Sequence, residues 1–138
     1  MGIDERLAAL FRQAPITMFL GQQLLRCDAG VAEVELPHRR EFEQGLGVTH
    51  GGVVATIADT AGFFAAASLV GPGLATVEFK INLVAPVREE TIRAKGTVAH
   101  RGHRLILCQI NVTGANEAVV ALAQATYTTV AVHSPVVP

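Results

Sequence analysis

One carboxylate stands apart in a long stretch of the sequence that is otherwise free of charge. Asp59 is the only acidic residue between Glu43 and Glu78, and no Lys or Arg occurs between Arg40 and Lys80. The surrounding residues are apolar, and burying an unpartnered carboxyl costs free energy unless something compensates. Two interpretations stay open: a structural Asp bonded to the backbone or exposed in a dimer groove, and a general base or nucleophile in a desolvated pocket.

The residues His50, Gly51 and Gly52 stand at the start of the same expected helix. The first N–H groups of a helix lack intrahelical partners and carry the positive end of its dipole. Such donors can polarise a carbonyl oxygen that gains negative charge as a tetrahedral intermediate forms, and glycines let a substrate approach the backbone closely. A Gly-Gly pair alone fits a simple turn, and its combination with Asp59 favours the catalytic interpretation.

The spacing between these two features limits how they can cooperate. Gly51 and Asp59 are eight residues apart, which places them about 12 Å apart along a helix axis. One reacting carbonyl carbon cannot lie ~3 Å from both groups. If both act on one substrate, they must come from two helices running side by side in opposite directions, as in a two-fold homodimer with two equivalent sites.

The elements that would position these residues form a simple pattern. Residues 51–69 are rich in alanine and apolar on every face, which predicts a helix enclosed by other elements. Four strand candidates follow the breaker at residues 71–73, and their alternation is typical of antiparallel strands with one covered face. These strand candidates are residues 76–84, 91–100, 105–113 and 119–132, with turns at 101–102 and 114–116.

The residues before the long helix predict one short helix and two strands. Asp4 is a suitable N-cap for a helix over residues 4–14, which Pro15 would end. Residues 17–26 are apolar, and residues 32–36 alternate. We therefore expect an α+β fold in one domain spanning residues 1–138, with an antiparallel sheet wrapped around one long central helix. Residues 133–138 are expected to form a loose tail.

Composition excludes several classes of partner. The chain has 11 Lys plus Arg and 12 Asp plus Glu, so its net charge of -1 favours neither nucleic acid nor an anionic membrane. The apolar run from Val53 to Val70 contains Asp59 and lacks basic flanks, which favours a buried helix over a membrane span. The start of the sequence shows no apolar stretch of signal-peptide length, so we expect a cytoplasmic protein. Cys27 and Cys108 are expected to be core thiols.

Three segments together resemble a known family. HGGVVATIADTAG, then ATVEFKINLVAPV and the turn VAHRGHR, resemble the PaaI-type, four-hydroxybenzoyl-CoA-thioesterase-like branch of the hotdog superfamily, over roughly residues 15–131. The resemblance implies a hotdog fold, a dimer as the active unit that is often paired into tetramers, and hydrolysis of acyl-CoA or aryl-acyl-CoA thioesters without a cofactor.

The same resemblance implies a role for particular residues. Asp59 corresponds to the acid that activates water or attacks directly, and the Gly51 N–H to the oxyanion donor. The resemblance implies three further catalytic residues. Thr76 supplies a hydroxyl that places the water or the acid, and Gln44 supplies an amide that holds the thioester or water. His50 orients the loop. Candidates for substrate binding are Gly52, Phe63 and, for the nucleotide end of CoA, Arg101, His103 and Arg104. An ordinary solvated hairpin is the alternative for the last three. A position in the core is the favoured alternative for Phe63.

Other chemistries find less support in the sequence. His100 and His103 form an HxxH pair, but it straddles a predicted turn and no nearby carboxylate or cysteine completes a ligand set, so we expect no metal. No G-x-S-x-G elbow or phosphate-binding loop is present. A non-enzymatic module that binds acyl-CoA stays open as the alternative function, and the sequence does not reveal the acyl group.

Overall fold

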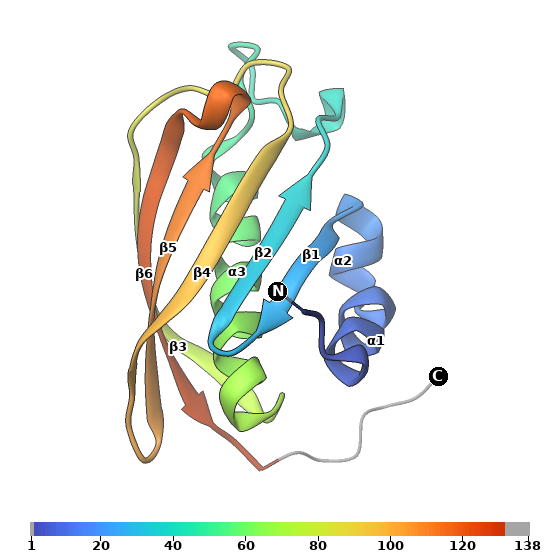
Figure 1. Cartoon of the computed structure of the whole chain (residues 1–138). Helices are drawn as coiled ribbons and strands as arrows, with labels where there is room; N and C mark the ends of the chain where they lie inside the picture. The colour runs from blue at the N-terminus through green and yellow to red at the C-terminus, as the bar shows by residue number, and fades with distance from the viewer. Residues whose placement is uncertain (1, 132–138) are drawn as a thin grey trace.

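The computed structural model describes residues 2–131, which form one sheet and three α-helices (Figure 1). The elements in chain order are α1 (Glu5–Gln13), α2 (Pro15–Leu20), β1 (Gln23–Asp28), β2 (Val31–Leu36), the 3-10 helix η1 (Arg40–Phe42), α3 (Gly51–Val70), β3 (Leu74–Leu83), β4 (Ile92–Arg101), β5 (Leu105–Thr113), the 3-10 helix η2 (Ala115–Glu117) and β6 (Val119–Thr129).

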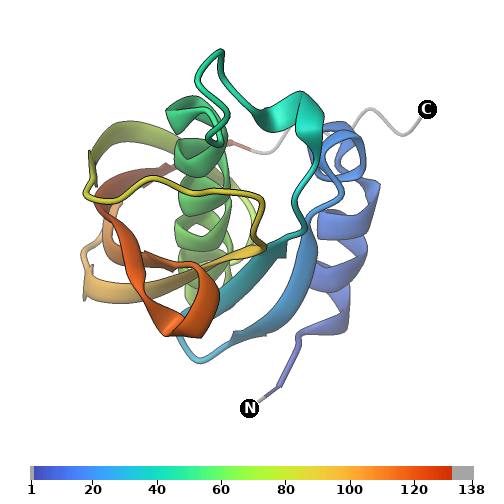
Figure 2. The same cartoon turned by 90° about the horizontal axis from the view of Figure 1, so that it is seen from above.

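The six strands form a single antiparallel sheet in the order β1-β2-β4-β5-β6-β3. Seen from above, the sheet curves around α3, and α1 and α2 lie beyond its β1 edge (Figure 2). This is the hotdog fold that the sequence predicts. The chain passes from β2 through α3 to β3, which pairs with β6 at the edge of the sheet opposite β1.

The long helix α3 buries one side and leaves the other open. Its sheet-facing residues, among them Ile57, Ala58 and Ala61, are fully buried. The opposite side carries a partly exposed stripe, here called the open stripe, which consists of Val53, Ala55, Thr56, Asp59, Thr60 and Phe63. The prediction of a helix enclosed on every face is therefore wrong for the single chain, because the sheet covers only one side.

Among the described residues, α3 is the one helix long and apolar enough to cross a membrane. Half of its most apolar 18-residue window is nevertheless buried inside the protein. The packing of that half against the sheet is that of a core helix, and this accounts for its composition without a membrane.

Two glycines mark the closest approach of α3 to the sheet. A Cβ atom on Gly96 of β4 would lie 2.6 Å from the carbonyl oxygen of Ala61. A Cβ on Gly62 would collide with the Tyr127 hydroxyl of β6 and would lie 3.1 Å from Ile110 Cδ1. A glycine in the middle of a helix costs about 1 kcal/mol relative to alanine, and this contact with β6 explains why one is present.

The N-terminal region departs from the prediction at one point. Helix α1 forms with Asp4 as its N-cap, as expected. Pro15 does not simply end that helix, because it is also the first residue of α2, which Gly21 ends in the left-handed conformation at φ 74°. Proline is favoured at the first position of a helix, since its φ is preset and its missing N–H is not needed there. Residues 15–20 are therefore helical, and β1 begins only at residue 23.

Both cysteines lie in the core, as predicted. Cys27 and Cys108 are free, fully buried thiols that donate to the carbonyl oxygens of Phe64 and Gly62, each at 3.4 Å. Burial raises the pKa of Cys27 from 9.0 to about 11 and that of Cys108 to about 12. The predicted tail, residues 133–138, lies outside the described residues.

Candidate active site

Asp59 lies halfway along α3 and is held by two hydroxyl groups from the sheet. Thr76 Oγ1 donates to Asp59 Oδ1 at 3.0 Å, and the Tyr127 hydroxyl lies 3.0 Å from the same oxygen. Tyr127 also lies 3.0 Å from the Asp59 carbonyl oxygen. The expectation of a buried carboxyl without a partner is wrong for the single chain: Asp59 is half-buried and has hydroxyl partners.

A bulge in β3 directs Thr76 toward Asp59. Thr76 stands opposite Tyr127 and Glu78 opposite Thr126, so Val77 is an extra residue in the pairing of β3 with β6. The extra residue reverses the alternation of the strand, and Thr76 and Phe79 consequently both face α3 although they are three residues apart. Bulges commonly re-aim a side chain next to a functional site.

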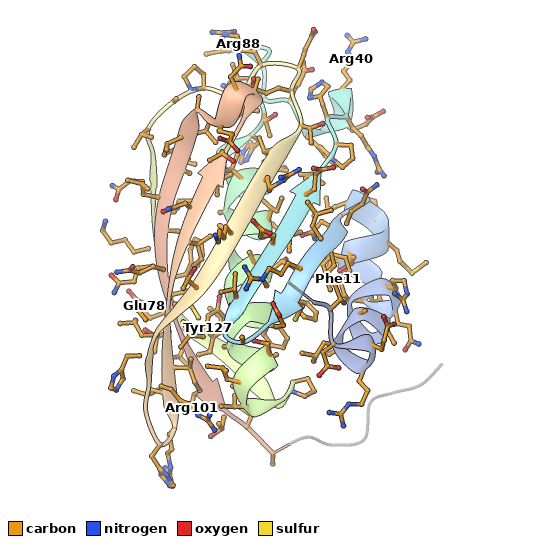
Figure 3. The ribbon with its side chains drawn as sticks, in the orientation of Figure 1. Phe11, Arg40, Glu78, Arg88, Arg101 and Tyr127 are labelled. Carbon is orange, nitrogen blue, oxygen red and sulfur yellow. The ribbon has the colours of Figure 1, made fainter. Side chains whose placement is uncertain are left out.

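Tyr127 is a site residue that the sequence reasoning missed. It is the only tyrosine in the chain and is completely buried, between the sheet and the lower half of α3 (Figure 3). Burial, and then the nearby Asp59 carboxylate, raise the pKa of its phenol well above 10. A buried tyrosine hydroxyl needs a hydrogen-bond partner. The sequence signal that could have identified this residue was a single Tyr on the covered face of β6, since its hydroxyl must find a partner there.

The start of α3 is organised by His50. Its Nδ1 accepts a hydrogen bond from the Gly52 N–H at 2.8 Å, so His50 is the N-cap of the helix. The N–H groups of Val53 and Val54 are both bonded to the His50 carbonyl oxygen. Within residues 2–131, the Gly51 N–H forms no hydrogen bond. It is therefore the first-turn donor left free for a ligand.

The two glycines after His50 have separate structural reasons. A Cβ on Gly51 would lie 2.5 Å from Leu83 Cδ1, the end of a half-exposed side chain that would have to move, and a Cβ on Gly52 would lie 3.0 Å from His50 Nδ1. The Gly52 N–H is already used by the cap, so this residue has no free amide N–H to offer a substrate. The space next to both glycines is thus filled by side chains of the same chain.

A pocket of about 320 Å³ adjoins Gly51. Gln44 lines it, together with apolar side chains from α3 and from the end of β3 and the loop after it, including Val54, Leu83 and Val87. The Gln44 carbonyl group Oε1 accepts a hydrogen bond from the Leu46 N–H, which stabilises the tight turn before the helix. Asp59 and Thr76 do not line this pocket.

Phe63 follows Asp59 by one helical turn on the open stripe. Its half-exposed ring makes edge contacts with Phe64 and with Tyr127, at centroid distances of 5.2 and 6.2 Å. It therefore forms an apolar border to the Asp59 carboxylate and is not sealed in the core.

The basic hairpin between β4 and β5 lies away from both groups. Arg101, His103 and Arg104 are exposed at its tip. In Figure 3, Arg101 lies toward the lower end of the molecule, at about the height of the last turn of α3, whereas Arg40 and Arg88 lie at the upper end where α3 begins. Within one chain, the hairpin, Asp59 and Gly51 are thus three separate features along one axis.

Among residues 2–131, no three His, Cys, Asp or Glu side chains converge in a way that could hold a metal ion. The polar groups of the described site are the Asp59 carboxylate, the hydroxyl groups of Thr76 and Tyr127, and the Gly51 N–H.

Comparison with known proteins identifies the family. Residues 46–121 match the model of the Thioesterase superfamily. The chain belongs to this superfamily. The chain is 31% identical over 103 residues to a candidate esterase of Saccharolobus solfataricus. The match covers 73% of this chain and 74% of that protein.

Solved structures show the same fold. A thioesterase family protein from Silicibacter pomeroyi has a TM-score of 0.85 at 27% identity, with 91% of this chain and 96% of that chain covered. The E. coli PaaI protein from the phenylacetic acid degradation operon has a TM-score of 0.85 at 22% identity, with 92% of both chains covered. The thioesterase family and the hotdog fold expected from the sequence are confirmed, the likeness to PaaI being one of fold, and superfamily membership supports hydrolysis of a thioester. The family match includes Gly51, Asp59 and Thr76 and begins after Gln44.

Proposed function

We propose that the protein is an acyl-CoA thioesterase whose active site forms between two copies of the chain. One observation carries the proposal: α3 holds a carboxylate with positioned hydroxyls at Asp59 and a free N–H beside a pocket at Gly51. These two halves of a hydrolytic site are about 12 Å apart along the helix. A second copy of α3, antiparallel to the first, would bring Asp59 of each chain next to Gly51 of the other chain.

In this site Asp59 acts as general base on a water molecule or attacks the thioester carbonyl directly. The carbonyl oxygen gains negative charge and is stabilised by the Gly51 N–H of the other chain. If Asp59 acts as the base, it takes a proton from water as the water oxygen bonds to the carbonyl carbon. Collapse of the tetrahedral intermediate then breaks the carbon–sulfur bond, and the CoA thiolate leaves and takes up that proton. If Asp59 attacks directly, departure of the thiolate leaves a mixed anhydride with Asp59, and water hydrolyses it to the free acid and the Asp59 carboxylate. Thr76 holds the carboxylate from β3.

The two-fold arrangement follows from simple arithmetic. If residue 59 of one helix faces residue 51 of its partner, residue i faces residue 110 - i, and the axis passes near residue 55. Ala55 is a small residue on the open stripe, which suits close contact of two helices. In the described structure β3 has a neighbour on one side only, and Val77 and Leu83 are 54% and 53% exposed. This free edge supports pairing with a second chain.

The same arrangement assigns a role to the basic hairpin. Because the helices run in opposite directions, the hairpin of one chain lies at the end where the partner's α3 begins. Arg101 and Arg104 there would contact the phosphates of CoA, and Phe63 would border the acyl group. Paired charges of this kind contribute modestly at an exposed surface.

The test of the function is hydrolysis of a panel of aryl, short-chain and long-chain acyl-CoAs. The release of the free CoA thiol measures the reaction. We expect turnover of at least one class and loss of about 100-fold or more in kcat for Asp59→Asn. Glu78→Gln is the matched control, because Glu78 is an exposed carboxylate in β3. Binding of acyl-CoA without turnover would instead support the non-enzymatic binding module, and full activity of Asp59→Asn would exclude its catalytic role.

A second experiment tests the two-fold axis without measuring activity. Ala55→Cys should form a disulfide between chains under mild oxidation, whereas Thr60→Cys, on the same stripe, should not, because its copies would be about 15 Å apart. Cys27 and Cys108 are buried and do not interfere. Equal cross-linking of both variants, or of neither, would contradict this axis.

A further inference from the structure

Tyr127 contacts two atoms of the same residue. Its hydroxyl lies 3.0 Å from Asp59 Oδ1 and 3.0 Å from the Asp59 carbonyl oxygen. A hydroxyl between these two oxygens links the side chain of Asp59 to its own backbone, and this restricts the rotamer of the carboxylate. Since Tyr127 is completely buried, the phenol has no alternative position in solvent.

The hydrogen bonds to Asp59 are unevenly distributed over its two oxygens. Thr76 and Tyr127 both reach Oδ1. Within residues 2–131, Oδ2 accepts no hydrogen bond. One oxygen is therefore held by the sheet, and the other stays available on the half-exposed side of α3.

Gly62 makes this arrangement possible. It lies one helical turn after Asp59, and a Cβ at this position would occupy the place of the Tyr127 hydroxyl. A glycine in the middle of a helix weakens it relative to alanine. Its presence in the middle of α3 is explained by the room that the phenol needs.

We infer that Tyr127 is a positioning residue that fixes the Asp59 carboxylate from behind, so that Oδ2 is the reacting oxygen, and that Gly62 is required for this placement. The inference rests on the proposed function, because it assumes that Asp59 acts on the thioester. Tyr127 itself touches neither substrate nor water, since it is buried beneath Asp59.

The first test separates positioning from substrate binding. Tyr127→Phe keeps the ring and removes the hydroxyl, so kcat should fall about 10- to 100-fold, the loss expected for one hydrogen bond to a charged group. KM should stay within about twofold, because the ring and the surface of the site are unchanged. An unchanged kcat would overturn the inference.

Rescue by a donor of similar size distinguishes positioning from packing. Incorporation of 4-aminophenylalanine at position 127 supplies an N–H in place of the O–H and should recover most of the lost kcat. Incorporation of 4-methylphenylalanine fills the same volume without a donor and should not. Equal activity of these two variants would show that the hydroxyl acts only through packing.

A double-mutant cycle tests the role of Gly62. Gly62→Ala should displace the hydroxyl and lower kcat by a factor similar to that of Tyr127→Phe. The double variant should fall no further than either single variant, because the interaction is lost only once. Additive losses would overturn the role of Gly62. Should Gly62→Ala fail to fold, the two position-127 variants still decide the role of the hydroxyl.

The outcomes also separate this inference from the proposed function. If Asp59→Asn is fully active, the proposed role of Asp59 is wrong. If Asp59→Asn is inactive and Tyr127→Phe is fully active, only the inference is wrong. An independent reading is available because the chain has one Tyr and no Trp. The near-ultraviolet absorption of Tyr127 should shift in Asp59→Ala, where its carboxylate partner is removed, and should not shift in Glu78→Gln.

Discussion

The middle of α3 and its beginning differ in what they contain. Around Asp59, two strands supply hydroxyl groups that hold a carboxylate, and Asp59 does not line the pocket at Gly51. Around Gly51, a pocket of about 320 Å³ meets a free N–H, and the nearest titratable side chain, His50, is occupied as the helix cap. Each region has what the other lacks. The two regions lie about 12 Å apart on one helix, and the proposed site therefore combines one region from each of two chains.

The strongest way to break this comparison is to damage each region in a different chain. Asp59→Asn and Gly51→Val, which collides with Leu83, should each lose about 100-fold or more in kcat. Random mixing of the two unfolded and refolded variants should restore about a quarter of wild-type activity, because half of the dimers are mixed and each mixed dimer has one intact site. No recovery on mixing would show that both regions act within one chain, or that they do not act together.

The support of Asp59 from β3 can be tested alone. Thr76→Val keeps the shape of the side chain and removes its hydroxyl, and we expect kcat to fall about tenfold. Thr126→Val is the matched control, since Thr126 bonds Glu78 and not Asp59. Steady-state kinetics of both variants measure the difference. Equal effects would mean that Thr76 contributes through the strand and not through Asp59.

The two core thiols report on the sealed side of α3. Their pKa values are raised by burial to about 11 and about 12, from an ordinary 9.0. Above pH 9 the unfolded chain therefore binds fewer protons than the folded chain, and the free energy of unfolding should fall as the pH rises. The slope per thiol is at most about 1.4 kcal/mol per pH unit.

Urea unfolding at pH 8 and pH 10 measures this loss, and replacing Cys108 by Ala should reduce the pH dependence. At pH 8 the folded protein should not react with Ellman's reagent, because the thiolate fraction is small and both sulfur atoms are buried. Rapid reaction of either thiol at pH 8 would contradict a sealed core beneath Asp59.

The smallest effect is expected at the basic hairpin. Arg101→Ala combined with Arg104→Ala should raise KM about two- to fivefold at low salt and leave kcat unchanged, because exposed charges are screened by solvent. Arg12→Ala on α1 is the control, since Arg12 is equally exposed on another face. The difference in KM between the double variant and the wild type should disappear as the ionic strength rises. A KM that does not respond would favour the solvated hairpin.

Local patterns in the sequence predicted the parts of the molecule that depend on neighbours in the chain. The isolated Asp59, the glycines at the start of α3 and the alternating strands are features of this kind. Tyr127 was missed because its contact with Asp59 joins residues 68 positions apart, and no local period encodes such a contact. Helix α2 was missed because a proline signals both the end of one helix and the start of the next.

The bulge at Val77 divides β3 into two independent parts. Before it, Thr76 serves the carboxylate, and after it, Phe79 and Ile81 pack on the core. Because the alternation restarts at the extra residue, one strand directs both a hydroxyl group and apolar side chains toward α3. The same strand thus anchors the helix in the core and holds its carboxylate, and a deletion of Val77 would turn one of these two sets of side chains away from the helix.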